Sequence, residues 1–457
     1  MKTAIILAAG RGSKMWPYSS TRQKATLPLA NKPLICRQVE KLVKSGIKRI
    51  IVVVGYRQEQ VKSVLADFGN IEFVEQIGEG TGGALLSALD RVEDERFLVL
   101  YGDVVLTFDD IAKLIDAQKK ADALCSMFVH PLGTDRPHDW ICAQIKEDKA
   151  LAVIGHPRDN ATHRVAGFFA FSKLFVAYLK KNVGPMQSVQ VGMMPPDEPQ
   201  LEDAIQHAIE NGEQVHALQT SGIAFDLDKP WHYLEASSFW NDYVCQKIDR
   251  DVIGKGAKIS DGADINGRLV LGEDAEIGKG AIIEGNLVLG AESKIIQGAI
   301  VGANAIAGDR CTIKRYCQIE SNTTLGPDCF VGHGAEVGGV FLRRCYAYHY
   351  GEFWGILGDN GDLGAATVCG NLRFDDQNTI HTIKGRREMP SFGANAAYLG
   401  DFVRTGVNVI LMPGVKVGAY SVVGAGTMVS EDVPDKTLIY VKQEQVKKAW
   451  GPEKYGW

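Results

Sequence analysis

The amino-acid sequence predicts two domains in series, an α/β domain with a mostly parallel sheet and, after it, a parallel β-helix. In the first half of the chain, short apolar runs alternate with amphipathic segments, the order typical of strands and helices in a parallel α/β sheet. In the second half, from Ile253, an aliphatic residue recurs at every sixth position, as in hexapeptide β-helices. The length of 457 residues agrees with this division, because one hydrophobic core rarely supports so long a chain.

Strand and helix patterns alternate from the N-terminus. Residues 3–7, 49–54 and 97–100 are almost entirely apolar, which indicates strands buried on both faces. Residues 33–45, 58–67 and 82–89 have helical patterns, and the first of them has Pro33 near its first turn and Gly46 beyond its end. This order predicts right-handed crossovers, so the carboxyl ends of the strands share one edge, where open α/β sheets bind ligands.

A glycine-rich run, L-A-A-G-R-G-S-K-M, occupies residues 7–15 at the end of the first predicted strand. Its small residues leave backbone N–H groups free to approach phosphate oxygens, and Arg11 and Lys14 add positive charge. Taken alone, such a run is equally well explained as an ordinary surface turn.

Two further features follow the ends of later strands. In E-Q-I-G-E-G-T-G-G-A, residues 75–84, the glycines allow a flat ring to approach, and the Gln76 amide can hydrogen-bond the edge of a base. Asp103 follows a strand and Gly102, and its carboxylate is suited to capping a helix. Beside a phosphate loop it is equally suited to Mg²⁺, which takes one or two carboxylates together with substrate phosphates.

The six-residue repeat is regular over most of the second half. Of the fifteen positions from Ile253 to Val337 taken in steps of six, fourteen are Ile, Leu or Val, and a second register runs from 399 to 429. A β-sandwich would show alternating strands at irregular spacing, so the repeat favours the β-helix. Cys311 and Cys329, eighteen residues apart, should stack one coil above the other, as small hydrophobic residues rather than as a disulfide or metal site.

These patterns divide the chain into a first domain at residues 1–230, a linker helix at 231–250, a β-helix at 251–434 and a C-terminal tail at 435–457. The repeat is interrupted near residues 340–354, which are aromatic and basic, and near 371–397, which include K-G-R-R at 384–387. Interruptions of a solenoid are usually loops that leave one face, so two loop insertions are expected there.

Composition disfavours several classes of protein. A net charge of −5 argues against nucleic-acid binding, and no uncharged apolar run approaches the roughly 20 residues of a membrane span. The nine cysteines include no C-x-x-C pair, and the first residues show no signal-peptide pattern. A reduced, cytoplasmic protein with neither nucleic acid nor membrane as a partner is therefore expected.

Five motifs in the first 231 residues resemble those of the sugar-1-phosphate nucleotidylyltransferases, which have a Rossmann-like sheet. They are L-A-A-G-R-G-S-K-M at 7–15, T-R-Q-K at 21–24 with the later Pro28, Lys32 and Pro33, G-T-G at 80–82, Y-G-D at 101–103 and F-D-L-D-K-P at 225–230. The resemblance implies catalytic roles at the phosphates for Lys14 and Lys24. It implies Mg²⁺ binding by Asp103 and Asp226. The nucleotide-binding residues that it implies are Leu7, Ala8, Ala9, Gly10, Gly12, Gln76, Gly80, Thr81 and Gly82.

The sequence departs from this family at several positions. Lys14 stands where the family has Arg, which removes the bidentate grip on phosphate. Trp140, Gly155 and Val165 replace sugar-side residues of members that use N-acetylglucosamine. These departures keep open a regulatory or scaffold protein that binds nucleotide without catalysis.

The second half resembles the left-handed β-helix acyltransferases, especially the acetyltransferase half of bifunctional N-acetylglucosamine-1-phosphate uridylyltransferases, and archaeal-type sugar nucleotidylyltransferases are the closest likeness. The shared motifs are N-L-R-F-D-D at 371–376, K-G-R at 384–386 and the run 404–419. The resemblance implies that His349 is a general base and that the chain forms a homotrimer. It places Asn371, Arg373 and Arg404 on the acetyl-CoA and acceptor side. His349 is equally well explained as a surface ring among neighbouring tyrosines.

Together the resemblances imply an enzyme of nucleotide-sugar biosynthesis. With Mg²⁺, it would transfer a nucleotidyl group from UTP, or as second choice dTTP, to a sugar-1-phosphate, giving pyrophosphate and a nucleotide sugar such as UDP-N-acetylglucosamine. A second activity would transfer an acetyl group from acetyl-CoA to an amino-sugar phosphate. An acyltransferase whose first half only recruits its acceptor is the remaining alternative.

Overall fold

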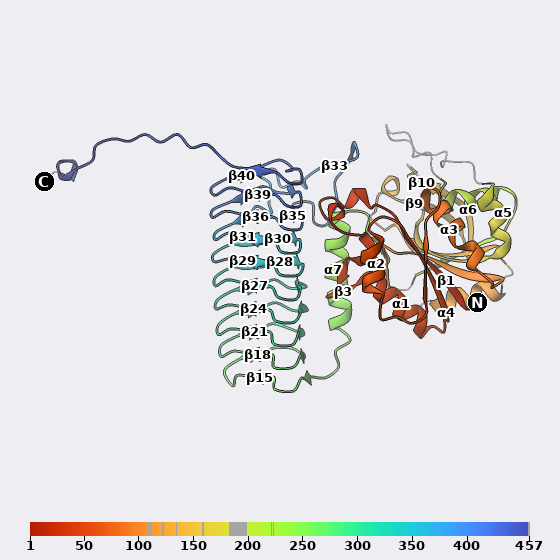
Figure 1. The fold of residues 1–457 in the computed structure, drawn as a ribbon, viewed down its shortest axis with the longest axis horizontal. Coiled ribbons are helices and arrows are strands. Elements are labelled where there is room, and N and C mark those ends of the chain that lie inside the picture. The colour runs from red at the N-terminus through yellow and green to blue at the C-terminus, as the bar shows by residue number, and fades with distance from the viewer. Residues whose placement is uncertain are drawn as a thin grey trace.

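The computed structural model describes residues 1–107, 111–120, 123–133, 135–157, 160–181, 199–220, 222 and 224–455. It shows an α/β domain and a left-handed parallel β-helix side by side, with helix α7 (Pro230–Cys245) between them (Figure 1). The end of the chain extends away from the β-helix, and residues 456 and 457 of the expected tail lie outside the described residues. Within the part of the chain that the structure describes, no helix is long and apolar enough to cross a membrane.

The first domain is built on a nine-stranded sheet in the order β5-β4-β1-β6-β11-β8-β12-β10-β9. Its strands are β1 (Thr3–Ala8), β4 (Arg49–Val54), β5 (Ile71–Glu75), β6 (Arg96–Tyr101), β8 (Cys125–Pro131), β9 (Ile141–Lys146), β10 (Lys149–Gly155), β11 (His163–Ser172) and β12 (Val215–Gln219). Strands β5, β4, β1 and β6 are parallel, whereas β11 runs antiparallel to β6. Two-stranded sheets pair β2 (Pro28–Leu29) with β3 (Lys32–Pro33) and β7 (Val104–Leu106) with β13 (Ala224–Asp226).

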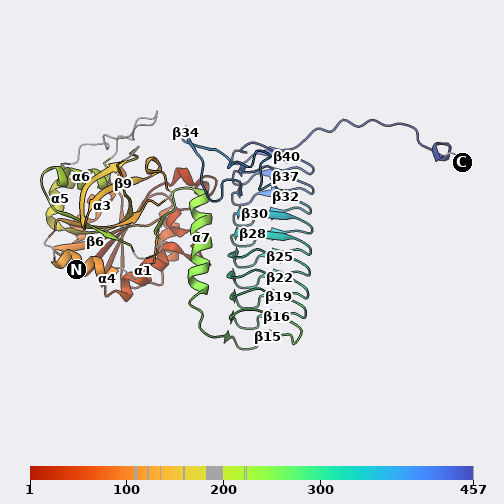
Figure 2. The ribbon, with the colours of Figure 1, turned by 180° about the vertical axis from the view of Figure 1, so that it is seen from behind.

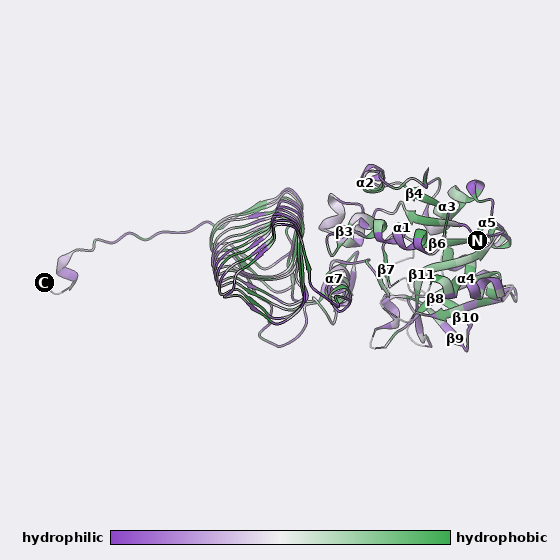
Figure 3. Ribbon diagram, turned by 90° about the horizontal axis from the view of Figure 1, so that it is seen from below, coloured by the Kyte–Doolittle hydropathy of each residue, from purple (hydrophilic) through white to green (hydrophobic). Residues whose placement is uncertain are grey.

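Helices cover both faces of this sheet. They are α1 (Leu34–Lys44), α2 (Gln58–Val64), α3 (Gly80–Ala88), α4 (Ile111–Lys120), α5 (Val176–Lys180) and α6 (Leu201–Glu210). Ile5 and Leu7 pack with α3, α5 and α6, whereas Ala4, Ile6 and Ala8 pack with α1, α2 and α4. Because alternate residues of a strand point to opposite faces, a strand covered on both must be apolar throughout. The predicted strands are therefore confirmed, and Figure 3 shows the central strands coloured as hydrophobic.

The predicted helices are present with shifted ends. Helix α2 ends at Val64, three residues before the predicted end. Helix α3 begins at Gly80, two residues earlier than predicted, so the G-T-G run is the first turn of a helix and not part of a loop. Pro33 precedes α1 as its N-cap.

The second half forms a solenoid of short parallel strands, seen end-on in Figure 3 as superposed coils. Its strands are β14 (Val252–Ile253), β15 (Lys258–Ile259), β16 (Asp264–Ile265), β17 (Leu269–Leu271), β18 (Glu276–Ile277), β19 (Ile282–Ile283), β20 (Leu287–Leu289), β21 (Lys294–Ile295), β22 (Ile300–Val301), β23 (Ala305–Ala307), β24 (Thr312–Ile313), β25 (Gln318–Ile319), β26 (Thr324–Leu325), β27 (Phe330–Val331), β28 (Glu336–Phe341), β29 (Tyr346–Ala347), β30 (Glu352–Leu357), β31 (Asp362–Leu363), β32 (Val368–Cys369), β35 (Ala397–Leu399), β36 (Arg404–Thr405), β37 (Ile410–Leu411), β38 (Lys416–Val417), β39 (Val422–Val423), β40 (Met428–Val429) and β41 (Leu438–Ile439). The aliphatic residues of the hexads fill its interior.

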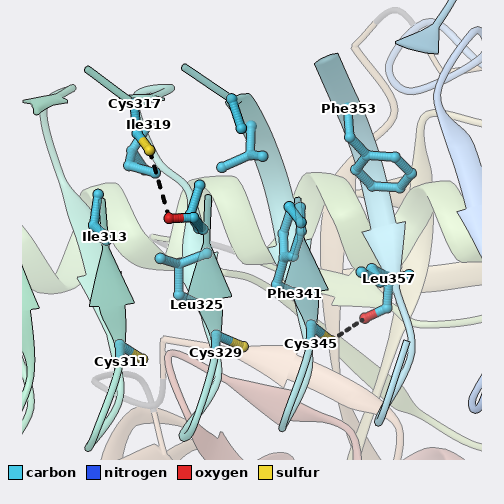
Figure 4. Packing of buried hydrophobic residues seen from close by; sticks show 14 of the residues in the cluster. Cys311, Ile313, Cys317, Ile319, Leu325, Cys329, Phe341, Cys345, Phe353 and Leu357 are labelled. Atoms are coloured by element: carbon cyan, nitrogen blue, oxygen red, sulfur yellow. Dashed lines mark hydrogen bonds between the residues drawn. The ribbon is translucent and has the colours of Figure 1, made fainter. Parts of the chain in front are cut away.

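The cysteines inside the solenoid are hydrophobic core residues. All nine cysteines of the chain are free, so the alternative of a disulfide between Cys311 and Cys329 is excluded. Figure 4 shows Cys311, Cys329 and Cys345 in line on successive coils. Each thiol donates to a backbone carbonyl of the next coil, at 3.1, 2.9 and 3.1 Å. The ladder of small residues is confirmed.

The expected loop insertion near 340–354 is wrong. The segment continues the solenoid as β28, β29 and β30, and Glu336 pairs directly with Glu352, sixteen residues later. Earlier coils repeat every eighteen residues, as in the pairing of Ile277 with Ile295. The six-residue repeat is lost in this segment because the coil is two residues shorter than the earlier coils. Residues 371–397 do leave the coil, and they include the hairpin of β33 (His381–Ile383) and β34 (Arg386–Glu388).

Helix α7 runs antiparallel to the rising stack of coils. Asn241, early in this contact, donates to Thr324 at 2.8 Å. One residue later Asp242 accepts from Asn304 at 3.0 Å, and the carbonyl of Cys245 accepts from Asn286 at 2.9 Å. Each later residue of the helix thus contacts an earlier coil, and the helix descends beside the solenoid in both Figures 1 and 2.

The domains are joined by carboxylates on one corner of neighbouring coils, which bind the segment Trp16–Arg22 of the first domain. The Arg22 guanidinium lies 2.6 Å from Asp359 and 3.0 Å from Asp401. The Thr21 hydroxyl donates to Asp401 at 2.6 Å, and the Trp16 indole N–H donates to Asp435 at 3.0 Å. Burial acts to lower the pKa of Arg22, but the two carboxylates outweigh it and raise that pKa.

We predict that Asp401→Ala lowers the free energy of unfolding by about 3 kcal/mol, because it removes a buried acceptor from the partly buried Arg22 guanidinium. The measurement is chemical denaturation followed by tryptophan fluorescence. The control is Asp328→Asn, which removes the surface charge that binds Arg310 at 2.7 Å and should have little effect. Asparagine tolerates the left-handed backbone of this position, where φ is 62°. If both variants lose the same free energy of unfolding, the contact of Arg22 with Asp401 stabilises the protein no more than a surface ion pair does.

Candidate functional site

A cavity of about 740 Å³ lies at the carboxyl ends of β1 and β6, where the topology predicts a ligand site. Of the residues implied by the resemblance, those lining it are Leu7, Ala8, Ala9, Gly10, Gly12, Lys14, Lys24, Gln76, Gly80, Thr81, Asp103 and Asp226. A second cavity, of about 810 Å³, lies at the domain contact around Arg22 and Asp401, whose charges already pair with each other. The first cavity is therefore the candidate site.

The glycine-rich run forms an open loop with unused donors. Gly12 adopts the left-handed conformation, with φ of 59°, and a Cβ there would meet the Lys24 side chain at 3.4 Å. Within the described residues, the N–H groups of residues 10–13 donate to no acceptor. The buried Gln23 amide donates to the carbonyl of Ala8 at 2.6 Å and so braces the loop against the segment that carries Lys24. Backbone donors held in this way are suited to phosphate oxygens.

The pairing of β7 with β13 brings the two predicted metal ligands together. Asp226 pairs with Val104 in this ladder, and the N–H of Leu227 donates to the carbonyl of Asp103 at 3.1 Å. Two carboxylates that are 123 positions apart in the sequence therefore lie at one point of the cavity wall. No local pattern in the sequence predicts this pairing.

The Lys24 ammonium lies among three carboxylates. It forms an ion pair with Asp103 and lies 3.9 Å from Asp226 and 3.7 Å from Asp228. Burial acts to lower the pKa of Lys24, but these carboxylates outweigh it and raise that pKa. Lys14 is held in the same cluster by an ion pair of 2.9 Å with Asp228. The cluster is therefore preorganised around both lysines.

Burial and the neighbouring Asp103 raise the pKa of Asp226. Burial also acts to raise the pKa of Asp228, but Lys14 and Lys24 outweigh it and lower that pKa. Asp228 is a site residue that the sequence analysis missed, although it lies within the motif F-D-L-D-K-P at 225–230. Its spacing of two from Asp226 was the available signal.

The carboxylates fit a divalent cation. The Oδ1 atom of Asp226 is buried and has no hydrogen-bond partner, which leaves a lone pair free for a cation. Among the described residues, no group of three or more His, Cys, Asp or Glu side chains is arranged to hold a metal. A cation here would take Asp103 and Asp226 and complete its shell with substrate oxygens, as Mg²⁺ usually does.

The G-T-G turn packs closely against the segment at Pro199. A Cβ on Gly80 would lie 2.1 Å from the carbonyl oxygen of Pro199, and the N–H of Gly82 donates to that oxygen at 3.0 Å. Thr81 binds the same segment, because its hydroxyl accepts from the N–H of Leu201 at 2.8 Å. The Cβ side of both glycines is therefore occupied by the chain itself. Gly80 and Thr81 line the cavity, whereas Gly82 does not.

The Gln76 amide does line the cavity, but its NH₂ group already donates to the carbonyls of Gly78 and Gly80 at 2.9 and 3.1 Å. Its side chain therefore also shapes the loop before α3. Trp140 stacks on His232 with ring centroids 4.9 Å apart, and its ring centroid lies 4.4 Å from the Arg164 guanidinium. A rigid aromatic and cationic group thus stands where the resemblance implies a sugar-side residue.

The implied acetyl-transfer residues lie on the β-helix, and none lines this cavity. The exposed His349 ring packs 4.8 Å from the His333 ring and contacts Tyr348 and Tyr350. Arg404 lies in β36, one coil beyond Asp362. Asn371 and Arg373 are exposed where the chain leaves the coil.

The K-G-R motif at 384–386 does not lie where the family resemblance places it. The resemblance implies the acetyl-CoA side, but the hairpin places Lys384 on the cavity of the first domain. That expectation is wrong, because the insertion leaves the solenoid and docks on the neighbouring domain.

Comparison with known proteins agrees with both halves of the fold. The model of the MobA-like NTP transferase domain matches residues 4–157, and that of the GMPPB C-terminal domain matches residues 248–344. The chain is 31% identical over 450 residues to the bifunctional protein GlmU of Methanococcus maripaludis, covering 97% of this chain and 98% of that protein. It is equally similar, at 31% over 449 residues, to the GlmU of Methanocaldococcus jannaschii, with the same coverage.

A further relative has a more explicit name. The bifunctional sugar-1-phosphate nucleotidylyltransferase/acetyltransferase of Sulfurisphaera tokodaii is 27% identical over 437 residues, covering 94% of this chain and 98% of its own length. The similarity to all three relatives spans both domains. The chain therefore belongs to the family of bifunctional GlmU proteins, the sugar-1-phosphate nucleotidylyltransferase/acetyltransferases, and the resemblance seen in the sequence is confirmed.

Proposed function

We propose that the chain transfers a nucleotidyl group from UTP to a sugar-1-phosphate and releases pyrophosphate, with dTTP as the second choice of donor. The observation that carries the proposal is the cluster of Lys14, Lys24, Asp103 and Asp226 facing an open loop of unused backbone donors in one cavity. We also propose that residues 1–230 form the nucleotidylyltransferase domain and residues 251–434 the acyltransferase-like domain.

The residues have separate roles in this proposal. The backbone of Leu7, Ala8, Ala9, Gly10 and Gly12 forms the cradle for the triphosphate. The base side is formed by Gln76, Gly80 and Thr81, with Gly82 holding the turn behind them. These assignments are supported by the cavity that all but Gly82 line.

The reaction requires positioning and charge neutralisation more than covalent chemistry. A phosphate oxygen of the sugar-1-phosphate attacks the α-phosphorus, a new P–O bond forms, and the bond to the β-phosphate oxygen breaks as pyrophosphate leaves. Lys14 and Lys24 neutralise charge on the phosphates as the loop N–H groups orient them. Mg²⁺, held by Asp103 and Asp226, would neutralise further charge on the phosphate oxygens.

A second activity is proposed for the β-helix, namely acetyl transfer from acetyl-CoA to an amino-sugar phosphate. The supporting observation is the exposed His349 ring, which packs against the half-buried ring of His333 on the preceding coil. In this proposal His349 is the general base. Asn371, Arg373 and Arg404 bind acetyl-CoA and acceptor, and the exposed face is completed by neighbouring subunits of a homotrimer.

The first test is a matrix of nucleoside triphosphates against sugar-1-phosphates, read as pyrophosphate release. We expect the highest kcat/KM with UTP, a lower value with dTTP, and loss of release when the divalent cation is chelated. Absence of release with every pair would refute the proposed reaction. If calorimetry then showed tight UTP binding, the scaffold alternative would be favoured.

We predict that Asp103→Asn and Asp226→Asn each lower kcat for pyrophosphate release by about 10²-fold or more, because each removes charge that holds the cation against the phosphates. Asp328→Asn, an equivalent change on the β-helix surface, is the control and should leave the rate unchanged. Wild-type turnover in either site variant would show that the metal assignment is wrong.

For the second activity, we predict that His349→Ala abolishes thiol release from acetyl-CoA with glucosamine 1-phosphate as acceptor and leaves pyrophosphate release intact. Asp226→Asn should have the reverse pattern, so the two variants are controls for each other. If the wild type releases no thiol with any amino-sugar phosphate, the β-helix has no acetyltransferase activity of this kind.

A further inference from the structure

The hairpin β33–β34 extends from the upper coils of the β-helix to the first domain (Figures 1 and 2). Its turn is Lys384-Gly385, and both residues have positive φ, 48° and 81°. Two residues of positive φ are typical of the tight two-residue turns that join antiparallel strands. The Lys384 side chain is therefore presented at the tip of a short, regular hairpin.

The hairpin is attached to the β-helix at its base. The buried His381 has Nε2 2.9 Å from the carbonyl of Ala394 and Nδ1 2.8 Å from the Lys416 ammonium. The same ammonium lies 3.2 Å from Asp432. The base of the hairpin is thus held by buried polar contacts within its own domain.

Strand β34 of the hairpin is held by the first domain. The Arg386 guanidinium donates to the carbonyl of His138 at 2.7 Å and to Asp139 at 3.2 Å. Glu388 forms an ion pair of 3.0 Å with Lys229, and both side chains are buried. Because Lys229 adjoins Asp228 of the lysine and carboxylate cluster, the hairpin is fixed next to the candidate site.

Lys384 lines the candidate cavity together with three other cationic residues. Lys14 and Lys24 are ion-paired with carboxylates, and the Arg11 guanidinium lies 5.5 Å from the centre of the Tyr56 ring. Lys384 is exposed, and no carboxylate in the described part of the chain lies within ion-pair distance of its ammonium. Its charge is thus available to a ligand.

We propose that Lys384 is a substrate-binding residue of the nucleotidylyl site, supplied by the second domain, and that its ammonium binds a phosphate group. The phosphate belongs either to the nucleoside triphosphate or to the sugar-1-phosphate. The inference rests on the function proposed above for this cavity. An ammonium at the tip of a docked hairpin provides a point charge for phosphate, and charge-assisted hydrogen bonds of this kind are among the stronger ones in proteins.

The hairpin provides its own control. Thr382 pairs with Arg387, and Ile383 pairs with Arg386, so Arg387 projects from the face opposite to the docked Arg386. Arg387 is exposed and does not line the cavity. Replacing Arg387 removes one positive charge from the same hairpin without removing it from the site.

The experiment measures pyrophosphate release by the full chain and by the variants Lys384→Ala, Lys384→Arg and Arg387→Ala. UTP and N-acetylglucosamine 1-phosphate are varied in turn. We expect Lys384→Ala to raise the KM of one substrate about tenfold, since one charged hydrogen bond is lost. Lys384→Arg should restore most of the affinity, and Arg387→Ala should match the wild type. The substrate whose KM rises identifies the phosphate that is bound.

Calorimetric titration with UTP and with inorganic pyrophosphate separates this inference from the proposed function. If the wild type is active and Lys384→Ala has the same KM values, the inference is overturned and the proposed function stands. The same holds if Arg387→Ala raises the KM as much as Lys384→Ala does. A wild type that binds UTP without turnover would refute the reaction, and weaker binding by Lys384→Ala would still support the phosphate contact. A wild type that neither binds nor reacts would overturn both.

Discussion

The buried contact of the Arg22 guanidinium with Asp359 and Asp401 determines how the two domains are placed, and the candidate site depends on that placement. Arg22 lies between Lys14 and Lys24 in the sequence, so the segment that connects these two lysines of the candidate site is bound to the β-helix. Desolvation makes buried ion pairs weak contributors to net stability, but a charge left without its partner is costly. We regard this contact chiefly as fixing the orientation of the domains.

The two lysines of the cavity are held by carboxylates before substrate arrives. Lys24 lies among three carboxylates, and Lys14 is paired with one of them. Substrate phosphates would therefore exchange partners with groups that are already in position, at little cost in side-chain ordering. Lys14 offers phosphate a point charge and lacks the forked donors of arginine. An additional cation such as Lys384 would therefore help to neutralise the charge of a triphosphate.

The elements that local periodicity determines were predictable from the sequence. Strands β1, β4 and β6, helices α1 to α3 and the eighteen-residue coils were predicted, because each depends on residues close together in the chain. The sixteen-residue coils were missed, since the hexad count has no means of recognising a shorter turn. The docking of Arg386 on Asp139 could not be predicted, because contacts between such distant residues leave no local signature. The proximity of Asp103 and Asp226 was expected only from the family resemblance, for the same reason.

Because α7 runs antiparallel to the stack of coils, the length of the helix and the height of the stack are linked. From β14 to β30 the chain climbs six strand spacings along one side of the solenoid, each about 4.8 Å. Helix α7 descends beside it at about 1.5 Å per residue. A relative that gained or lost one whole coil below β30 would move its docking corner by one spacing, and about three residues of helix would have to be added or removed with it. Coil number and linker length should therefore change together among relatives, in steps of about one turn.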